Sequence, residues 1–283
     1  MSADAGPALS DLPSLKIALQ SLGVVADKRF GQHFLFDLNV CRKIVRNAGV
    51  GVGDTVVEVG PGPGGLTRAL AESGADIIAI ERDARFLPLL EEIAARADGR
   101  LRIVHGDALE IDEQALLAGR GAHLVSNLPY NVGTPLLMKW LLGPWRPLSL
   151  TLMFQKEVAD RLVALPGRSA YGRLSVIAQI LCDIRTVMDL PARAFTPPPK
   201  VDSAVIRALP LAVRPNEAEL SALQSLTAAA FGQRRKMLRA SLRAFGGASL
   251  CESIGIDPSA RAETLPPEAF LALTRAWRKT QGD

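Results

Sequence analysis

Residues 127–130, Asn-Leu-Pro-Tyr, place an amide, a proline and an aromatic ring directly after an apolar segment. The exocyclic amine of a planar base is a poor nucleophile because its lone pair is delocalised into the ring. Acceptors on its two protons would concentrate the lone pair, and the Asn127 side-chain oxygen and the Leu128 carbonyl can be those acceptors. Pro129 fixes the turn, and Tyr130 can stack on a flipped base. The alternative is an ordinary β-turn that ends a strand.

A glycine-rich segment, EVGPGPGGLT at residues 58–67, follows another short apolar run. It contains the pattern G-x-G-x-x-G, formed by Gly60, Gly62 and Gly65. Glycine lets the backbone approach a ligand closely, and the following helix N-terminus favours negative charge. Glu58 adds the pattern E-x-G-x-G, which resembles motif I of the S-adenosylmethionine methyltransferases. Pro61 and Pro63 remove N–H donors that a pyrophosphate would need, which favours S-adenosylmethionine over NAD.

Carboxylates follow the next two apolar runs. Glu81 ends the first run, 21 residues after Gly60, where a carboxylate accepts hydrogen bonds from both hydroxyls of a cofactor ribose. Asp107 ends the second run and could accept a hydrogen bond from the adenine amino group, although an aspartate there is also a common helix cap. Because the carboxyl ends of parallel strands meet at one edge of a sheet, we expect Gly60, Glu81 and Asp107 to lie together.

The elements that must position these residues alternate between short β-branched runs and amphipathic segments. Apolar runs typical of a parallel sheet occupy residues 55–59, 76–80, 101–106, 123–127, 148–154, 184–190 and 203–209. Helical patterns separate most of them, which predicts an α/β, Rossmann-like fold with a mostly parallel sheet and helices on both faces. Only helical patterns remain after about Pro210. We therefore expect a catalytic domain at 1–210, with an N-terminal extension at 1–27, and a small all-helical domain at 211–283.

Composition narrows the class of protein. The chain has 283 residues, 48% of them hydrophobic, and no uninterrupted apolar stretch approaches the ~20 residues of a membrane span. The N-terminus lacks the pattern of a signal peptide, so we expect a cytoplasmic protein with no membrane partner. The cysteines are few and far apart (Cys41, Cys182 and Cys251), which argues against a disulfide framework and against a bound metal.

Positive charge gathers toward the C-terminus. From residue 192 onward the chain carries 13 Lys and Arg against 8 Asp and Glu. Its densest part is FGQRRKMLRASLR, residues 231–243, with Arg234, Arg235, Lys236, Arg239 and Arg243 and no acid. We expect one helix there, with a basic stripe beside an apolar stripe, and the basic stripe to contact RNA phosphates. The alternative is a solvated basic face.

These motifs together resemble one family. The chain is similar from about Lys28 onward to the small-subunit ribosomal RNA adenine dimethyltransferases. The matching segments, in the family's order, are KRFGQHFL (28–35), VVEVGPGPGGLT (56–67), AIERD (79–83), GDAL (106–109), NLPYNVGTPLL (127–137), MFQKEVADRL (153–162), YGRLSV (171–176), FTPPPKVDSAV (195–205) and FGQRRKMLRASL (231–242). The length and order of these segments make the resemblance specific.

The resemblance implies a cofactor, a substrate and a set of site residues. S-adenosylmethionine would lie across Gln32, His33, Leu35, Gly60, Gly62, Glu81, Asp107, Ala108 and Asn127. Asn127, Leu128 and Tyr130 would act on the target amine, and Phe195 would form a second aromatic wall around the base. His33 stands where the family more usually has Asn. The implied substrate is two adjacent adenosines in the 3′-terminal hairpin loop of 16S rRNA within the small ribosomal subunit, and the product N6,N6-dimethyladenosine, made by a monomer that also contributes to subunit assembly.

Three other functions compete with this one. A 23S rRNA adenine methyltransferase of the antibiotic-resistance type shares motifs like Asn-Leu-Pro-Tyr, and a ribosome-assembly factor could keep the fold without catalysis. An NAD oxidoreductase would need a proton relay near the strand ends. His105 and His123 lie inside apolar runs, so we expect both in the core.

Overall fold

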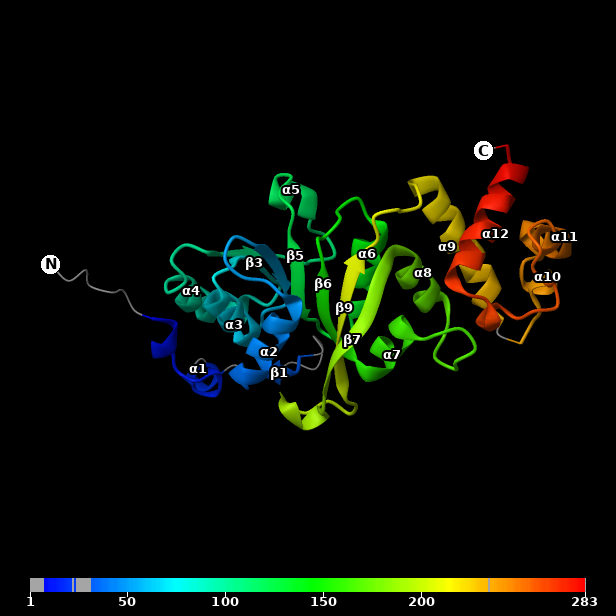
Figure 1. Ribbon diagram of the computed structural model, residues 1–283. Coiled ribbons are helices and arrows are strands. Elements are labelled where there is room, and N and C mark those ends of the chain that lie inside the picture. The colour runs from blue at the N-terminus through cyan, green and yellow to red at the C-terminus, as the bar shows by residue number, and fades with distance from the viewer. Residues whose placement is uncertain (1–7, 22, 24–31, 234, 283) are drawn as a thin grey trace. The chain divides into compact units, whose positions relative to one another are not determined.

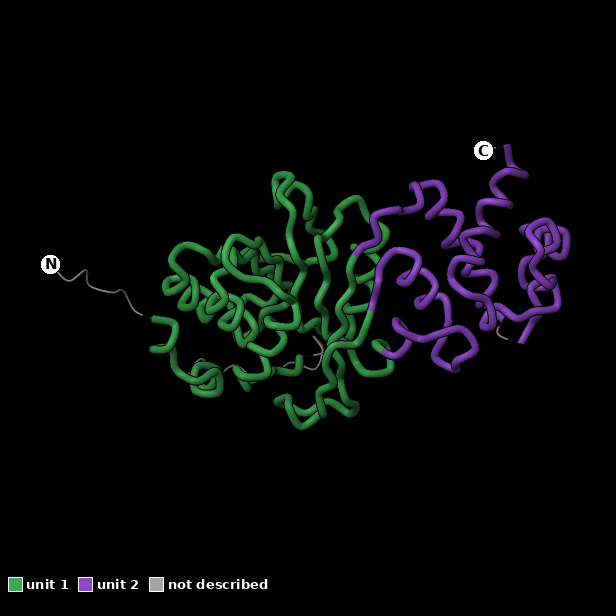
Figure 2. Tube along the Cα trace, in the orientation of Figure 1, with its two compact units in different colours: residues 1–159, 185–209 green, residues 160–184, 210–283 purple. Residues whose placement is uncertain are grey.

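Strands and helices alternate through most of the chain, as the sequence predicts (Figure 1). The computed structural model describes residues 8–21, 23, 32–233 and 235–282. The chain divides into two compact units, residues 1–159 with 185–209 and residues 160–184 with 210–283 (Figure 2). The expected boundary near residue 210 lies where the chain enters the second unit for the last time. The assignment of a separate function to each part stays a prediction.

A seven-stranded sheet with the order β4-β3-β2-β5-β6-β9-β7 positions the site. Its strands are β2 (Thr55–Val59), β3 (Asp76–Glu81), β4 (Leu101–His105), β5 (His123–Asn127), β6 (Leu150–Gln155), β7 (Cys182–Leu190) and β9 (Ser203–Pro210). The strands from β4 through β6 are parallel, and β9 runs antiparallel to β6. Strand order reverses between β2 and β5, which is where open α/β sheets bind their ligands.

Helices connect these strands and cover the sheet. They are α2 (Leu38–Ala48), α3 (Gly65–Ser73), α4 (Leu87–Ala94), α5 (Glu113–Leu117), α6 (Gly133–Leu142) and α7 (Lys156–Val163), with short 3-10 turns η3 (Ala84–Phe86) and η4 (Ala192–Ala194). Val56 and Val57 point to opposite faces of β2, and both are fully buried. Both faces of the sheet are therefore covered, as a parallel sheet requires.

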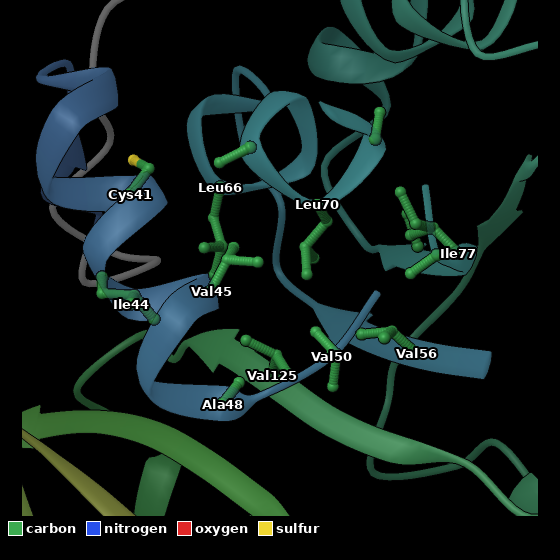
Figure 3. Packing of buried hydrophobic residues seen from close by; sticks show 14 of the residues in the cluster. Cys41, Ile44, Val45, Ala48, Val50, Val56, Leu66, Leu70, Ile77 and Val125 are labelled. Carbon is green, nitrogen blue, oxygen red and sulfur yellow. The ribbon is translucent and has the colours of Figure 1, made fainter. Parts of the chain in front are cut away.

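One large apolar cluster joins α2 and α3 to the sheet (Figure 3). The side chains labelled there include Ile44, Val45, Leu66, Leu70, Val56, Ile77 and Val125, which come from two helices and three strands. Full burial of an aliphatic side chain of this size stabilises the fold by about 1.5–3 kcal/mol. The cluster fixes α2 and α3 against the sheet whose carboxyl edge carries the binding site.

A second, two-stranded sheet was not foreseen from the sequence. β1 (Phe34–Leu35) pairs antiparallel with β8 (Phe195–Thr196). Before it come the turn η1 (Leu9–Asp11) and helix α1 (Leu15–Ser21), which lie in the expected N-terminal extension. Ala18 and Leu19 of α1 are buried in one cluster with Phe34 and Phe86. The described part of the extension thus packs against the body that carries the site.

The second unit is helical, as expected for the C-terminal region. Its elements are α8 (Arg173–Leu181), α9 (Glu217–Phe231), α10 (Leu238–Ser241), η5 (Arg243–Phe245), α11 (Gly247–Glu252), η6 (Ala262–Thr264) and α12 (Pro267–Thr280). The Phe231 ring lies 6.1 Å from the Tyr171 ring and 5.4 Å from the Phe270 ring. Within the described ranges, no helix combines the length and apolar character that a membrane crossing requires.

The prediction of one continuous helix over residues 231–243 is wrong. α9 ends at Phe231, and α10 begins only at Leu238. The backbone at the start of α10 bonds to another segment: the Leu238 N–H donates to the Ala260 carbonyl at 2.8 Å and the Arg239 N–H to the Pro258 carbonyl at 2.9 Å. These bonds replace the helical bonds that local sequence favours.

The placement of the two strand histidines also needs correction. His105 is exposed, and its strand β4 is one of the two edge strands of the seven-stranded sheet. His123 is half-buried, and its Nδ1 lies 2.8 Å from the Ser149 hydroxyl. The apolar composition of a strand reveals neither that β4 lies at an edge of the sheet nor that His123 is the first residue of the inner strand β5, which is why both were expected in the core.

Candidate active site

A cavity lies at the carboxyl ends of β2, β3, β4 and β5, where the strand order reverses. Its lining includes the predicted site residues Gln32, His33, Leu35, Gly60, Gly62, Glu81, Asp107, Ala108, Asn127, Leu128 and Tyr130. They come from five separate segments of the first unit. The convergence follows from topology, since parallel strands bring their carboxyl ends to one edge.

The glycine loop uses its own N–H groups within the protein. The Gly60 N–H donates to the Ile80 carbonyl at 2.9 Å, and the Gly62 N–H donates to Glu81 Oε2 at 2.9 Å. The Gly64 N–H donates to the Pro61 carbonyl at 3.0 Å. Pro61 and Pro63 have no N–H. The loop from Gly60 to Gly64 therefore offers no free donor to a pyrophosphate, which argues against a dinucleotide cofactor.

Gly60 ties this loop to the Asn-Leu-Pro-Tyr turn. Its φ of +68° lies in the left-handed region that favours glycine. A β-carbon there would lie 3.2 Å from Cδ of Pro129. The two turns therefore pack directly on each other, and Gly60 permits both the backbone conformation and the close approach.

Glu81 is held by backbone donors at the end of β3. Its Oε2 accepts from the Gly62 N–H at 2.9 Å and its Oε1 from the Asp83 N–H at 2.7 Å. Burial raises the pKa of Glu81, and these two N–H groups lower it. A carboxylate has about four acceptor sites, so two backbone bonds leave capacity for ligand hydroxyl groups.

Glu58 is the most deeply buried acid of the cavity lining. It is 1% exposed, and its Oε2 has no hydrogen-bond partner in the part of the chain that the structure describes. Burial raises the pKa of Glu58 to about 8, and the charge of Glu81 adds to the shift. Glu58 is therefore mostly protonated at neutral pH in the absence of a cation.

The raised pKa of Glu58 predicts a pH-dependent stability. Between its ordinary pKa of 4.5 and the folded value of about 8 the folded state binds more protons, so stability falls as pH rises. The slope is at most ~1.4 kcal/mol per pH unit. Glu58→Gln should remove this slope. The free energy of unfolding, measured by urea denaturation, should therefore rise for the variant relative to the unmodified protein from pH 5 to pH 8.5. A parallel dependence in both proteins would contradict a buried, protonated Glu58.

Asp107 and Ala108 follow β4 on the next side of the cavity. Asp107 Oδ1 accepts from the Leu109 N–H at 3.0 Å, and its Oδ2 pairs with Arg82 Nη1 at 2.9 Å. Arg82 is 62% exposed, so this ion pair is weak and a ligand can compete with it. Ala108 is buried, with its carbonyl bonded away from solvent to Lys139.

The acceptors proposed for a target amine are both available. Asn127 ends β5 and is half-buried, and Leu128 is buried. Neither the Asn127 side chain nor the Leu128 carbonyl takes part in a hydrogen bond among the described residues. The Pro129 carbonyl, in contrast, accepts from the Val132 and Gly133 N–H groups and begins α6. The turn thus uses the Pro129 carbonyl within the protein and leaves these two acceptors open.

Tyr130 is fixed from two sides. Its hydroxyl lies 2.5 Å from the hydroxyl of Ser203, a fully buried residue at the start of β9. The His33 ring lies 5.2 Å from the Tyr130 ring, and His33 Nδ1 lies 2.7 Å from the Pro197 carbonyl. Burial raises the pKa of Tyr130, so the phenol stays neutral at physiological pH. A neutral, immobilised ring is suited to stacking on a planar base.

Gln32 and Leu35 line the other end of the cavity. Gln32 Nε2 donates to Asp83 Oδ2 at 2.9 Å, and Arg85 beside Asp83 lowers the pKa of that carboxyl. Leu35 is buried, and β1 pairs it with Phe195. Residues 32–35 are therefore attached both to the turn that follows β3 and to strand β8.

Other predicted residues lie elsewhere. Phe195 is 2% exposed and belongs to the large apolar cluster, and it does not line the cavity. Its role as an aromatic wall stays a prediction. Arg235, Lys236, Arg239 and Arg243 are exposed in the second unit, with Leu238 and Leu242 between them fully buried, and Arg234 lies outside the described residues. The basic side chains of this segment thus face solvent and its leucines face the interior, even without a continuous helix.

Two supporting residues were missed by the sequence analysis. Ser203 holds Tyr130, and the Ser126 hydroxyl donates to the Val59 carbonyl, joining β5 to β2 at the cavity edge. Ser126 lies inside an apolar run, where a buried serine implies a specific partner. No local pattern marks Ser203, since its partner is 73 residues away.

The charge of the cavity suits a cationic cofactor. The carboxyl groups of Glu81, Asp83 and Asp107 line it beside the protonated carboxyl of Glu58, and the basic side chains of the described lining are His33 and Arg82. The unpartnered Glu58 oxygen and the absence of free loop N–H groups fit a sulfonium-bearing nucleoside better than a phosphate ester. The fold and the site define a Rossmann-like methyltransferase that uses S-adenosylmethionine.

Comparison with known proteins identifies the family. The model of the ribosomal RNA adenine dimethylase family matches residues 24–279, and the chain belongs to this family. The relative named Ribosomal RNA small subunit methyltransferase A in Phenylobacterium zucineum is 66% identical over 269 residues, 95% of this chain and 94% of the relative. Its namesake in Caulobacter vibrioides is 68% identical over 252 residues, 89% of this chain and 97% of the relative. The resemblance drawn from the sequence is confirmed.

Solved structures agree on the fold. A dimethyladenosine transferase from Plasmodium falciparum superposes with a TM-score of 0.76 at 24% identity, covering 88% of this chain and 98% of its own. The 23S rRNA methyltransferase ErmE superposes with a TM-score of 0.67 at 26% identity, covering 87% and 99%. The predicted α/β methyltransferase fold with a helical C-terminal region is therefore confirmed.

Proposed function

We propose that this chain transfers methyl groups from S-adenosylmethionine to two adjacent adenosines in the 3′-terminal hairpin loop of 16S rRNA, giving N6,N6-dimethyladenosine. The proposal rests on membership of the ribosomal RNA adenine dimethylase family and on relatives named for the small subunit. We also propose that the protein acts as a monomer in the cytoplasm. Its substrate would be RNA within the small ribosomal subunit, and it would contribute to the assembly of that subunit.

The residues around the cavity would hold the cofactor by its separate parts. Glu81 would accept the ribose hydroxyls, and Asp107 with Ala108 would face the adenine. His33, Leu35 and Gln32 would complete the opposite wall, with Gly60 and Gly62 allowing close approach of the loop. When bound, S-adenosylmethionine supplies an electrophilic methyl group.

Asn127 and Leu128 would activate the target amine without removing a proton first. Their oxygens would accept its two N–H groups, which draws the nitrogen toward tetrahedral geometry and directs the lone pair at the methyl group. Tyr130, held by Ser203, would stack on the flipped adenine. The observation that carries the proposal is that both acceptors are free of internal hydrogen bonds at the cavity edge.

Reverse transcription tests the substrate and product. N6,N6-dimethyladenosine has no amine proton for base pairing, so a reverse transcriptase should stop at it. Expression of the chain in bacteria whose 16S rRNA lacks the modification should restore stops at two adjacent adenosines near the 3′ end. Stops in 23S rRNA alone would favour the antibiotic-resistance type of enzyme, and stops in neither RNA would favour a non-catalytic assembly factor.

The exposed basic residues of the second unit would contact RNA phosphates. Arg235→Ala combined with Arg239→Ala should weaken binding to small subunits and lower the dependence of log K on log salt by about one unit per lost phosphate contact. Filter binding at several salt concentrations measures the slope. Arg46→Ala with Arg102→Ala removes the same charge from exposed positions of the first unit and serves as the control. An unchanged slope in the first pair would remove this segment from the interface.

A further inference from the structure

Lys139 occupies an unusual position for a lysine. It lies on α6 with its side chain 26% exposed, and its ammonium group makes three hydrogen bonds within the protein. The acceptors are the Ala108 carbonyl at 2.7 Å, the Ile111 carbonyl at 2.5 Å and Glu113 Oε1 at 2.8 Å. An ammonium group has three donors, so Lys139 is fully engaged.

Two of the partners of Lys139, Ala108 and Ile111, belong to the segment between β4 and α5, and the third, Glu113, is the first residue of α5. Residues 106–108 of this segment line the cavity on the side assigned to the adenine. The segment is irregular, and irregular segments hold a single conformation only when their polar backbone groups find partners. Lys139 supplies partners for two of its carbonyls and so fixes the backbone that presents Asp107 and Ala108.

Glu113 makes the arrangement rigid. It is 4% exposed, and its Oε1 also accepts from Trp140 Nε1 at 2.8 Å. Trp140 is 2% exposed and follows Lys139 on α6. Two consecutive residues of α6 therefore bond to one buried carboxylate of α5, which fixes α5 and the segment before it against α6.

α6 itself begins immediately after the Asn-Leu-Pro-Tyr turn. Gly133 is its first residue, and Leu136 on its first turns lines the cavity. Lys139 thus links the helix that follows the amine-binding turn to the segment on the adenine side. The Lys139 ammonium group and the Trp140 indole N–H together join these two parts of the site.

We propose that Lys139 is a positioning residue for the cofactor: by holding the Ala108 and Ile111 carbonyls it sets the adenine side of the cavity, and it does not touch the cofactor. The inference rests on the proposed use of S-adenosylmethionine. According to this inference, Lys139 affects the affinity for the cofactor. It does not affect the rate of methyl transfer once the cofactor site is saturated.

The variant must remove the hydrogen bonds without stranding a charge. Lys139→Met alone leaves Glu113 buried without its counter-charge, which destabilises a fold strongly. Lys139→Met combined with Glu113→Gln removes both charges and keeps an oxygen for Trp140. Arg275→Met combined with Glu219→Gln is the matched control, since it removes both charges of the 2.7 Å ion pair between these residues, neither of which lines the cavity.

Calorimetric binding of S-adenosylhomocysteine and of 5′-methylthioadenosine tests the inference. The double variant should bind both about 10-fold or more weakly, because both carry the adenosine and small displacements of a binding group are costly. Lys139→Arg, which keeps the charge and donors, should recover most of the affinity, and the control should bind normally. The transfer rate at saturating S-adenosylmethionine should stay within about twofold of the unmodified protein, in line with an effect on binding alone.

Other outcomes separate the inference from the proposed function. Unchanged affinity in the double variant, with or without a lower melting temperature, would show that Lys139 only stabilises the fold. Loss of affinity for S-adenosylhomocysteine alone would place the effect on the methionine side and overturn the inference. Failure of the unmodified protein to bind either ligand would instead contradict the proposed function.

Discussion

Asn127→Ala should lower the rate of methyl transfer by about 10²–10³-fold or more, the usual cost of removing one preorganised hydrogen-bonding group from a transition state. The side-chain oxygen of Asn127 is open at the cavity edge, so its loss removes an acceptor from the amine and breaks no internal bond. Binding to small subunits should change little, because phosphate contacts supply most of that affinity. Single-turnover kinetics and subunit binding, measured on the same preparation, separate the two effects.

Asn127→Asp serves as the companion variant. It keeps an acceptor oxygen at the same place and should retain more activity than Asn127→Ala. Dimethylation at the normal rate by Asn127→Ala would remove the acceptor role, and equal loss of subunit binding would point to a misfolded turn instead.

Glu81→Ala should weaken cofactor binding by about 100-fold or more. Hydrogen bonds to a charged group contribute about 1.5–3 kcal/mol each, and Glu81 is expected to accept two from the ribose. Alanine would also release the Gly62 and Asp83 N–H groups, which Glu81 holds at 2.9 and 2.7 Å. Titration with S-adenosylhomocysteine measures the effect.

Glu81→Gln distinguishes charge from shape. It keeps one acceptor oxygen, so it should lie between the alanine variant and the unmodified protein. Burial raises the pKa of Glu81, so the carboxylate takes up a proton sooner when the pH is lowered. The cofactor affinity of the unmodified protein should therefore begin to fall, as the pH is lowered, at a higher pH than it would with an exposed glutamate. An affinity unaffected by Glu81→Ala would exclude the ribose contact.

The sequence predicts that the proposed cofactor-binding residues converge, and the reason is topological. Gly60, Glu81, Asp107 and Asn127 each follow a short apolar run, and parallel strands bring such positions to one edge. The structure places all four around one cavity. Knowledge of the strand order is not needed, because every parallel strand ends on the same side.

Contacts between distant segments could not be read from the sequence. Ser203 and Lys139 act on residues far along the chain, and neither lies in a pattern with a mechanism of its own. The break between α9 and α10 has the same origin, since the backbone of Leu238 and Arg239 bonds to residues 258–260. Local propensity predicts one helix there, and tertiary hydrogen bonds override it.

The most direct measurement is methyl transfer by the purified protein with labelled S-adenosylmethionine. Small ribosomal subunits that lack the modification are the substrate, large subunits are the control, and the RNA is digested to nucleosides for separation. We predict labelled N6,N6-dimethyladenosine from the small subunit alone. Label in the large subunit, or no label in either while subunit binding is retained, would contradict the proposed function.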